Sequence, residues 1–366
     1  MEKLSSLQAH FENLPDPRIV AKCDHLLIDI VSLSICATLA GADDWQEIET
    51  FGKSKEPWLR QWLELPFGIP SHDTIERVFR KLDATEFESC FIAWTSEIFS
   101  QLPRQVVAID GKTLRGCAEK LHLVSAWASE SGISLGQCKV DSKSNEITAI
   151  PELLKLLVLK GSIVTIDAMG CQKKIAQEIV NQEADYVLAV KGNQGTLHEY
   201  IKTRFALSDD SRFSNHEQPH YTETIERQRG RTEKRRCWVF HDTEIADNRG
   251  WANCQTIIRI SCERQFHNQT EQETRYFIST LPAQPALLLA CVRAHWSIEN
   301  SFHWVLDVVF KEDQARTQHE NGATNLAVLR RIALNLIKRH KGKGSLKSKR
   351  YRAALDEDFL SEVLQS

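Results

Sequence analysis

The chain has 366 residues, of which 42% are hydrophobic and 26% charged, a composition typical of soluble globular proteins. That length favours two or three domains over a single core. No stretch reaches the ~18–20 uncharged apolar residues of a membrane span, since the best candidate, residues 26–40, is shorter and contains Asp29. The first residues lack the basic-then-apolar pattern of a signal peptide, and the ten cysteines are scattered without a C-x-x-C pair. We therefore expect a cytoplasmic protein with reduced thiols.

Residues 1–100 have the pattern of a helical N-terminal domain. Asp24 stands where a capping residue would precede the apolar stretch 25–39, and Gly41 follows the end of that stretch. Another helix is predicted from Ser71 or Asp73 onward, with an apolar stripe on one side and charged residues on the other. That charged side suits either a plain surface helix or a helix lying against DNA phosphates.

From about residue 101, short strands alternate with helices. Strands at 106–110, 122–128 and 133–140 precede a helix at 149–160, a strand at 162–167, a helix at 172–182 and a strand at 185–191. This is the element order of a ribonuclease-H-like α/β sheet. By that analogy, residues 101–195 are the first part of a ribonuclease-H-like catalytic core.

The rest of the chain divides into three predicted segments. Residues 196–285 contain four strand patterns and are expected to form a β-rich insertion. Residues 286–340 return to helix and are assigned to the catalytic core, beginning with a long helix at Pro285. Residues 341–366 are expected to be a basic and then acidic tail, at most partly ordered. The basic run 227–236 lies in the insertion, and such runs contact nucleic acid about as often as they form a solvated face.

Two aspartates follow buried strand patterns. Asp110 ends the apolar run 106–109, and Asp167 ends the run 162–166. A buried charge is costly unless it is paired or bound to a metal. Ligands of α/β sheets usually bind at the edge where such strands end. A third acid, Glu299, lies on the predicted helix after Pro285 and could reach both aspartates.

The helix that carries Glu299 has a polar ribbon beside its apolar side. Its members are spaced four residues apart and are His295, Glu299, His303 and Asp307. We expect the other three side chains to support Glu299.

Three clustered carboxylates are suited to divalent metal chemistry. Mg²⁺ is typically held by one or two carboxylates plus substrate phosphate, and a pair of ions about 4 Å apart can activate an attacking oxygen and stabilise a leaving one. Ordinary caps and ion pairs remain the alternative for any single acid. We expect Asp110, Asp167 and Glu299 to be catalytic and to hold two Mg²⁺ or Mn²⁺ ions.

Two tempting motifs do not fit their chemistry. The segment Gly111-Lys-Thr113 resembles the end of a phosphate-binding loop, but Val106 stands where that pattern requires glycine. The segment His216-Glu-Gln-Pro-His220 has the letters of a zinc-protease motif, but Pro219 would interrupt the helix that the motif requires. We therefore expect neither a phosphate-binding loop nor a zinc-protease site at these segments.

Five motifs in order give the chain a family resemblance. They are Ala108-Ile-Asp-Gly-Lys-Thr-Leu-Arg-Gly116, Asn145-Glu-Ile-Thr-Ala-Ile-Pro151, Thr165-Ile-Asp-Ala-Met-Gly-Cys-Gln172, Leu188-Ala-Val-Lys-Gly-Asn-Gln-Gly195 and His295-Trp-Ser-Ile-Glu-Asn300. Together they resemble the H-repeat-associated, ISAs-type transposases of bacterial insertion sequences, from about Leu7 to Leu364.

The resemblance implies a DDE transposase with a ribonuclease-H-like catalytic domain, preceded by the domain associated with such transposases. Asp110, Asp167 and Glu299 would then be its metal-binding triad. The wider group of relatives has Tyr, Arg and Lys around the glutamate, where this chain has Val292, His295 and Leu306. This departure bears on the roles of the neighbouring residues.

The expected function is metal-dependent cleavage at the ends of an insertion sequence, followed by strand transfer to target DNA. The expected partners are double-stranded DNA, as element ends and as target, and a second copy of the chain when DNA is bound, with no membrane and no small-molecule substrate. The expected location is the bacterial cytoplasm, at the nucleoid. The residues expected to contact DNA are Lys112, Arg115, Lys191, Asn193, Arg227, Arg229 and Arg231. The alternatives are a metal-dependent nuclease on the same fold and an inactivated transposase that only binds DNA.

Overall fold

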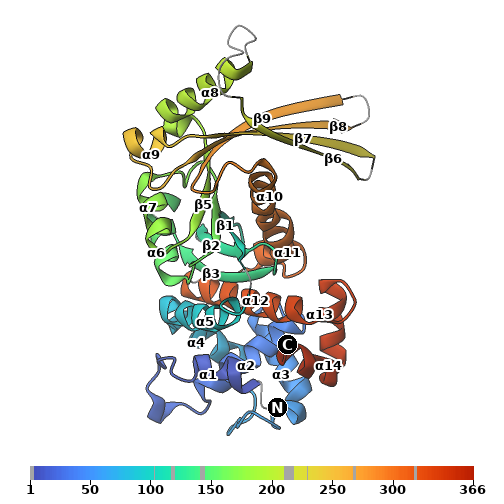
Figure 1. The fold of residues 1–366 in the computed structure, drawn as a ribbon. Coiled ribbons are helices and arrows are strands. Elements are labelled where there is room, and N and C mark those ends of the chain that lie inside the picture. The colour runs from blue at the N-terminus through green and yellow to red at the C-terminus, as the bar shows by residue number, and fades with distance from the viewer. Residues whose placement is uncertain are drawn as a thin grey trace. The chain divides into compact units, whose positions relative to one another are not determined.

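The computed structural model describes residues 4–102, 104–116, 120–140, 145–209, 218–228, 230–266, 269–316 and 320–366 (Figure 1). The chain folds into two units. The helical unit comprises residues 1–102, 111–141 and 299–366, and the sheet unit comprises residues 103–110 and 142–298. No described helix is long and apolar enough to cross a membrane.

The helical unit is organised around the long helix α12. Its helices and turns are α1 (Leu4–Phe11), η1 (Val20–Lys22), α2 (Leu27–Leu39), α3 (Trp45–Leu59), α4 (His72–Lys81), α5 (Ala84–Phe99), η4 (Glu299–His303), α11 (Trp304–Val308), η5 (Glu312–Gln314), α12 (Glu320–Arg339), α13 (Leu346–Leu355) and α14 (Glu357–Leu364). Strands β2 (Leu121–Ala128) and β3 (Ile133–Lys139) form an antiparallel hairpin. Helix α12 contacts α2, α4, α5 and β3, so it joins the N-terminal helices to the hairpin.

Buried asparagines fix the position of α12. The Asn335 side chain accepts a hydrogen bond from the Ser134 amide and donates one to the Ser134 carbonyl, both at 2.8 Å. The Asn325 side chain donates to the Phe79 carbonyl at 2.8 Å. Leaving such buried groups unpaired costs about 1–3 kcal/mol, so these bonds disfavour a shifted packing of α12.

The helix ends show which capping predictions hold. Ser71 caps α4, since its side chain accepts from the Thr74 amide, and this decides between the two predicted capping residues. Gly41 has φ of +115°, which confirms the predicted glycine end of α2. The predicted cap by Asp24 is wrong, because α2 begins at Leu27 and Leu26 occupies the capping position without a side-chain bond.

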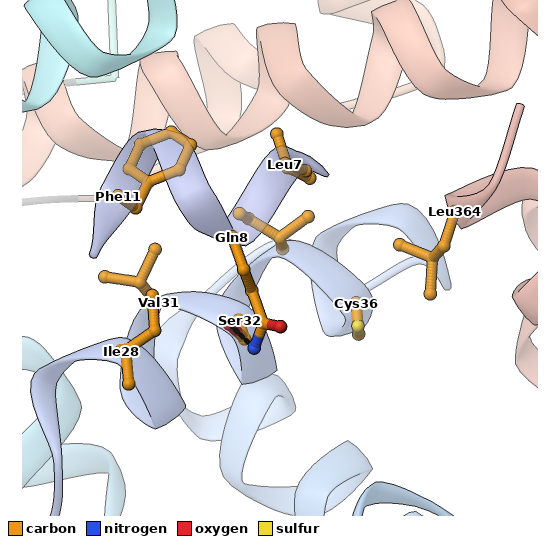
Figure 2. Close-up of a pocket in the computed structure, with 9 residues that line it drawn as sticks. Leu7, Gln8, Phe11, Ile28, Val31, Ser32, Cys36 and Leu364 are labelled. Atoms are coloured by element: carbon orange, nitrogen blue, oxygen red, sulfur yellow. Dashed lines mark hydrogen bonds between the residues drawn. The ribbon is translucent and has the colours of Figure 1, made fainter. Parts of the chain in front are cut away.

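The two ends of the chain meet at helix α2 inside the helical unit. Figure 2 shows Leu7, Phe11 and Leu364 beside α2, where Gln8 Nε2 donates to Ser32 Oγ at 3.2 Å. The space left between these side chains is about 10 Å³, about the smallest that could hold a single water molecule. This is a packing seam and not a ligand site.

Residues 341–366 do not form the expected tail. They fold into α13 and α14, which contact α12, and α13 also contacts α2. The reason is an apolar stripe that includes the buried Phe359, Leu360 and Val363. The basic residues are divided as well, because Lys349 and Arg350 are buried and donate to backbone carbonyls.

The sheet unit has the strand order β1-β4-β5-β9-β8-β7-β6. The strands are β1 (Val106–Leu114), β4 (Ile163–Ile166), β5 (Asp185–Val190), β6 (His220–Gln228), β7 (Arg231–His241), β8 (Thr256–Phe266) and β9 (Gln269–Ser279). Strands β1, β4 and β5 are parallel, while β9 to β6 continue the sheet in antiparallel fashion. The predicted α/β class is therefore confirmed, with a large mixed sheet. The four strands predicted within 196–285 are all present, and they extend this sheet through the β5–β9 pair.

Helices cover both faces of the sheet unit (Figure 1). They are α6 (Glu146–Leu156), α7 (Lys173–Asn181), η2 (Gly192–Gln194), α8 (Gly195–Asp209), α9 (Glu244–Arg249) and α10 (Pro285–His295). Helix α10 packs its Leu288 and Val292 on a core that contains Val106, Ile163 and Ile258. Helices α6 and α7 lie on the opposite side of β4 and β5.

The long helix predicted from Pro285 is interrupted. Helix α10 ends at His295, residues 299–303 form a π-helical turn, and α11 follows from Trp304. A continuous apolar pattern predicts one helix, but a π turn inserts one extra residue without removing the apolar side. The polar ribbon spaced four residues apart is therefore broken at this turn.

Glu88 provides a test of the core of the helical unit. Glu88 is buried, and its Oε1 accepts a hydrogen bond from the backbone amide of Gln137 at 2.8 Å. Burial raises the pKa of this carboxyl to about 8. The folded state therefore keeps a proton that the unfolded chain loses above pH ~4.5. Stability from this site is full below that pH and is lost as the pH rises toward 8.

We predict that Glu88→Gln, whose side chain is neutral at every pH, does not show this loss of stability as the pH rises. Its unfolding free energy relative to the parent protein should rise by about 1 kcal/mol per pH unit between pH 5 and 8. Urea unfolding at several pH values measures this. Glu86→Gln, an exposed acid on the same helix, is the matched control and should show no such trend. Parallel curves for Glu88→Gln and the parent would contradict the prediction.

Candidate active site

Parallel pairing of β1 with β4 brings Asp110 and Asp167 together. The register aligns Val106 with Ile163 and Ile109 with Ile166, so the next residue on each strand is an aspartate. Residues aligned in this way point to the same face of a sheet. Asp110 does not end its strand as expected, because β1 continues to Leu114. It marks the point where the β1–β4 pairing ends and the chain passes to the helical unit.

The backbone after β4 fixes the Asp167 carboxylate. Its Oδ1 accepts from the amides of Met169 at 3.0 Å and Gly170 at 3.2 Å. A Cβ on Gly170 would lie 2.3 Å from the Ile166 side chain, so only glycine fits there. The motif Thr165-Ile-Asp-Ala-Met-Gly170 thus encodes a turn that orients one carboxylate.

The turn η2 holds the Asp167 loop from the next strand. Asn193 Nδ2 donates to the Ala168 carbonyl at 2.6 Å, and Gln194 Nε2 donates to the Cys171 carbonyl at 3.0 Å. Lys191, which starts this turn, is exposed. Asn193 was predicted to contact DNA, and in the structure its amide bonds to the backbone of the loop. The sequence indicated a turn here, but nothing in it pointed to the bond from Gln194.

His295 bonds to the same strand. Its Nδ1 lies 3.0 Å from Thr165 Oγ1, two residues before Asp167. Burial lowers the pKa of His295 to about 4, so the ring is neutral at physiological pH even though Asp167 favours its charged form. Sequence reasoning missed Thr165, because a threonine inside a buried strand looks like any other β-branched residue.

The predicted polar ribbon beyond His295 belongs to the helical unit, and its members differ in environment. Glu299 is exposed and begins the π-helical turn. His303 is buried, and burial lowers the pKa of its ring to about 3. The neighbouring Phe302 stacks on Trp127 of β2, with ring centroids 4.9 Å apart. Such π turns are rare in proteins, and those that occur often lie at functional sites.

A cluster of four charged side chains joins β1 to the segment after Glu299. Lys112 Nζ pairs with Asp307 and, at 3.0 Å, with Glu312 Oε2. Arg331 Nη1 donates to Glu312 Oε1 at 2.8 Å. Although burial opposes it, Arg331 and Lys112 hold the pKa of Glu312 at about 2. We call these four residues the Lys112 cluster. The Lys112 ammonium group, which is predicted from the sequence to contact DNA, is thus paired with two carboxylates of the protein.

Arg115 is the exposed cation of the first motif. Its side chain is 85% exposed, and the nearest carboxylate atom, Asp313 Oδ2, is 4.0 Å from Nε. The adjacent Gly116 faces the backbone of residues 313–315, where a Cβ would lie 2.6 Å from a carbonyl oxygen. The glycine thus allows a close backbone contact beside an exposed guanidinium.

Most of the basic run 227–236 is paired with acids of its own strand or of neighbouring strands. Arg231 Nη2 lies 3.2 Å from Glu233, and Lys234, Arg235 and Arg236 also pair with glutamates of β6, β7 or β8. Arg227 is exposed, and no carboxylate within the described ranges pairs with it. Arg229 lies outside the described residues. The run therefore carries less uncompensated positive charge than its sequence suggests.

The carboxylate pair has the chemistry of a divalent metal site. Mg²⁺ and Mn²⁺ prefer oxygen ligands, and both aspartates are only partly buried. Among the residues that the structure describes, no three His, Cys, Asp or Glu side chains form a group that could hold a metal ion. The sheet unit by itself thus offers two acidic ligands.

The chain matches two protein families and several known proteins. Residues 8–95 match the family described as DDE_Tnp_1-associated, and residues 101–336 match the family described as Transposase DDE domain. The chain is 42% identical to "Putative transposase YncI" of Escherichia coli O157:H7, over 99% of this chain and 95% of that protein. It is 38% identical to "H repeat-associated putative transposase YhhI" of E. coli K12, over 99% and 98%. A shorter K12 protein named "Inactive transposase YbfQ" matches 21% of this chain at 43% identity.

Two residues at the η2 turn have different roles. Asn193 holds the Asp167 loop, whereas Lys191 is exposed. We predict that Asn193→Ala lowers the unfolding free energy by about 1 kcal/mol, because it removes a hydrogen bond to the Asp167 loop. Lys191→Gln, the matched control on the same turn, should change it by less than about 0.5 kcal/mol. Thermal unfolding measures both. Equal stabilities of the two variants would contradict the role of Asn193.

Proposed function

The chain belongs to the H repeat-associated transposases and carries a transposase DDE domain, and from this premise we propose that it cuts the ends of an insertion sequence and joins them to target DNA. The proposed catalytic residues are Asp110, Asp167 and Glu299, with two Mg²⁺ or Mn²⁺ ions. The observation that carries the proposal is the β1–β4 register, which aligns the two aspartates.

Chain connectivity supports Glu299 as the third ligand. His295 bonds to Thr165, two residues before Asp167, and Glu299 follows His295 by four residues. Four residues span at most about 14 Å between Cα atoms, so chain length alone keeps the Glu299 Cα within that distance of the His295 Cα. Its exposed carboxylate is the first acid in the sequence after α10.

The proposed fold of the catalytic core is ribonuclease-H-like. Elements β1, β2, β3, α6, β4, α7 and β5 follow one another in the order on which this assignment rests. Residues 101–195 would form its first part and 286–340 its last, with 196–285 as the insertion and 1–100 as the associated N-terminal domain. These boundaries follow the sequence pattern.

The proposed mechanism consists of two displacements at phosphorus. Water attacks the phosphodiester at the element end, the bond from phosphorus to the 3′-oxygen breaks, and that oxygen leaves as a 3′-hydroxyl. The hydroxyl then attacks a target phosphodiester, loses its proton and displaces the target's own 3′-oxygen, which takes up a proton. Divalent ions at such a site polarise the attacking oxygen and stabilise the leaving one.

The chain's own residues hold this site in place. The amides of Met169 and Gly170 fix Asp167 Oδ1, which prevents the carboxylate from rotating. Neutral His295 packs beside Asp167 without adding positive charge that would compete with cations. Preorganised groups of this kind need no rearrangement during the reaction.

DNA contacts are proposed for the exposed cations. Arg115, Lys191 and Arg227 are exposed, and phosphate contacts of this type contribute affinity without reading sequence. Arg229, which lies outside the described residues, and Arg231, the first residue of β7, are retained as further candidates. A second copy of the chain would pair the two element ends, and the complex would assemble at the nucleoid.

The triad is tested with a metal-dependent assay that measures cleavage and joining of element-end DNA. We predict that Asp110→Asn, Asp167→Asn and Glu299→Gln each reduce both products at least 100-fold, because each removes a charged ligand that acts in the transition state. Asp247→Asn, an exposed acid of α9 outside the triad, is the control and should keep activity within about threefold.

Two results would change the proposal. Unchanged product yield with Asp110→Asn would show that the acids are not the catalytic ligands. Hydrolysis products alone, even with target DNA present, would favour a nuclease on the same fold.

A further inference from the structure

The Lys112 cluster is buried deeply enough to restrain the backbone around it. Side chains of Glu312 and Arg331 are fully buried, and that of Lys112 is 10% exposed. Removing one partner from such a group leaves an uncompensated charge, which is strongly destabilising. Lys112, Asp307, Glu312 and Arg331 therefore keep a single arrangement.

The cluster holds the segment that follows Glu299 at two points. Asp307 is in α11 and Glu312 is in η5, and the single ammonium group of Lys112 pairs with both. On the other side, Arg331 donates to the Ala327 carbonyl at 2.9 Å and lies over the Phe302 ring, 5.4 Å from its centroid. The segment 299–314 is thus fixed to β1 and to α12.

Glu299 needs an external restraint of this kind. It is exposed and begins a π-helical turn, which is a less regular backbone than an α-helix. The buried ring of Phe302 and the ion pair of Asp307 are among the contacts that hold this turn. Lys112 also lies only two residues after Asp110 on the same strand.

We infer that Lys112 is a positioning residue, which presents the Glu299 carboxylate for metal binding through its pairs with Asp307 and Glu312. This inference rests on the proposed metal site. It assigns to Lys112 a role inside the protein in place of a contact with DNA.

The charge of Lys112 and its proposed positioning role predict opposite effects of a Lys112 substitution on cation affinity. Replacing a lysine by methionine removes one positive charge and leaves two carboxylates unpaired, which by Coulomb attraction alone would tighten binding of a cation. If Lys112 acts by placing Glu299, the same substitution weakens cation binding. Changing a residue that orients a metal ligand typically costs 10–100-fold in affinity.

The experiment measures Mn²⁺ affinity of the full chain, without DNA, from the electron paramagnetic resonance signal of free Mn²⁺. We expect Lys112→Met to bind Mn²⁺ at least tenfold more weakly, and Lys112→Arg to restore most of the affinity because it keeps the charge. In a Glu299→Gln background, Lys112→Met should cause no further weakening, since the residue that it positions is absent. If Lys112→Met does not fold, Lys112→Gln, which removes the same charge, replaces it in the same cycle.

Thr95→Ala is the matched control for general loosening. It removes the buried hydrogen bond from Thr95 Oγ1 to the Leu135 carbonyl in the same unit, on elements that carry no member of the cluster, and should leave Mn²⁺ affinity within about twofold. Unchanged or tighter Mn²⁺ binding by Lys112→Met, or an equal loss with Thr95→Ala, would overturn the inference while Glu299→Gln still shows the triad effect. If Asp110→Asn and Glu299→Gln also bind Mn²⁺ like the parent, the proposed metal site itself fails.

Discussion

The parallel register of β1 and β4 is the constraint on which the rest of the site depends. Side chains alternate along a strand, so a shift of one residue would turn Asp167 to the opposite face from Asp110. Every local feature near this edge preserves that alignment. The Gly170 turn orients one carboxylate, Asn193 ties the loop to the next strand, and His295 bonds to Thr165 on the same face.

Ion pairing decides which cations of this protein are available to DNA. The sequence contains 46 Lys and Arg residues against 49 Asp and Glu residues, so most positive groups can find an acid nearby. In the cluster, Lys112 pairs with acids in its own unit, and the glutamates of β6 to β8 compensate the basic run. Arg115, Lys191 and Arg227 remain exposed. DNA affinity should therefore depend on a few exposed cations and respond to salt accordingly.

The alignment of the two aspartates was predictable because the signal is local: a short apolar run precedes each of them, although β1 continues past Asp110 to Leu114. The π-helical turn was not, since the apolar pattern from Leu288 to Val305 fits a continuous helix equally well. The partners of Lys112 lie 195 and 200 residues away along the chain, so no local pattern could reveal them. The helices of residues 341–366 were missed because the basic residues obscured a short apolar stripe.

The central claim is that Asp110, Asp167 and Glu299 bind the same divalent ions. Anomalous X-ray diffraction from crystals grown with Mn²⁺ and element-end DNA tests it most directly, because it locates the ions independently of activity. The account predicts Mn²⁺ peaks with carboxylate oxygens of all three residues within about 2.0–2.4 Å. Mn²⁺ bound without Glu299, or at another set of acids, would contradict it.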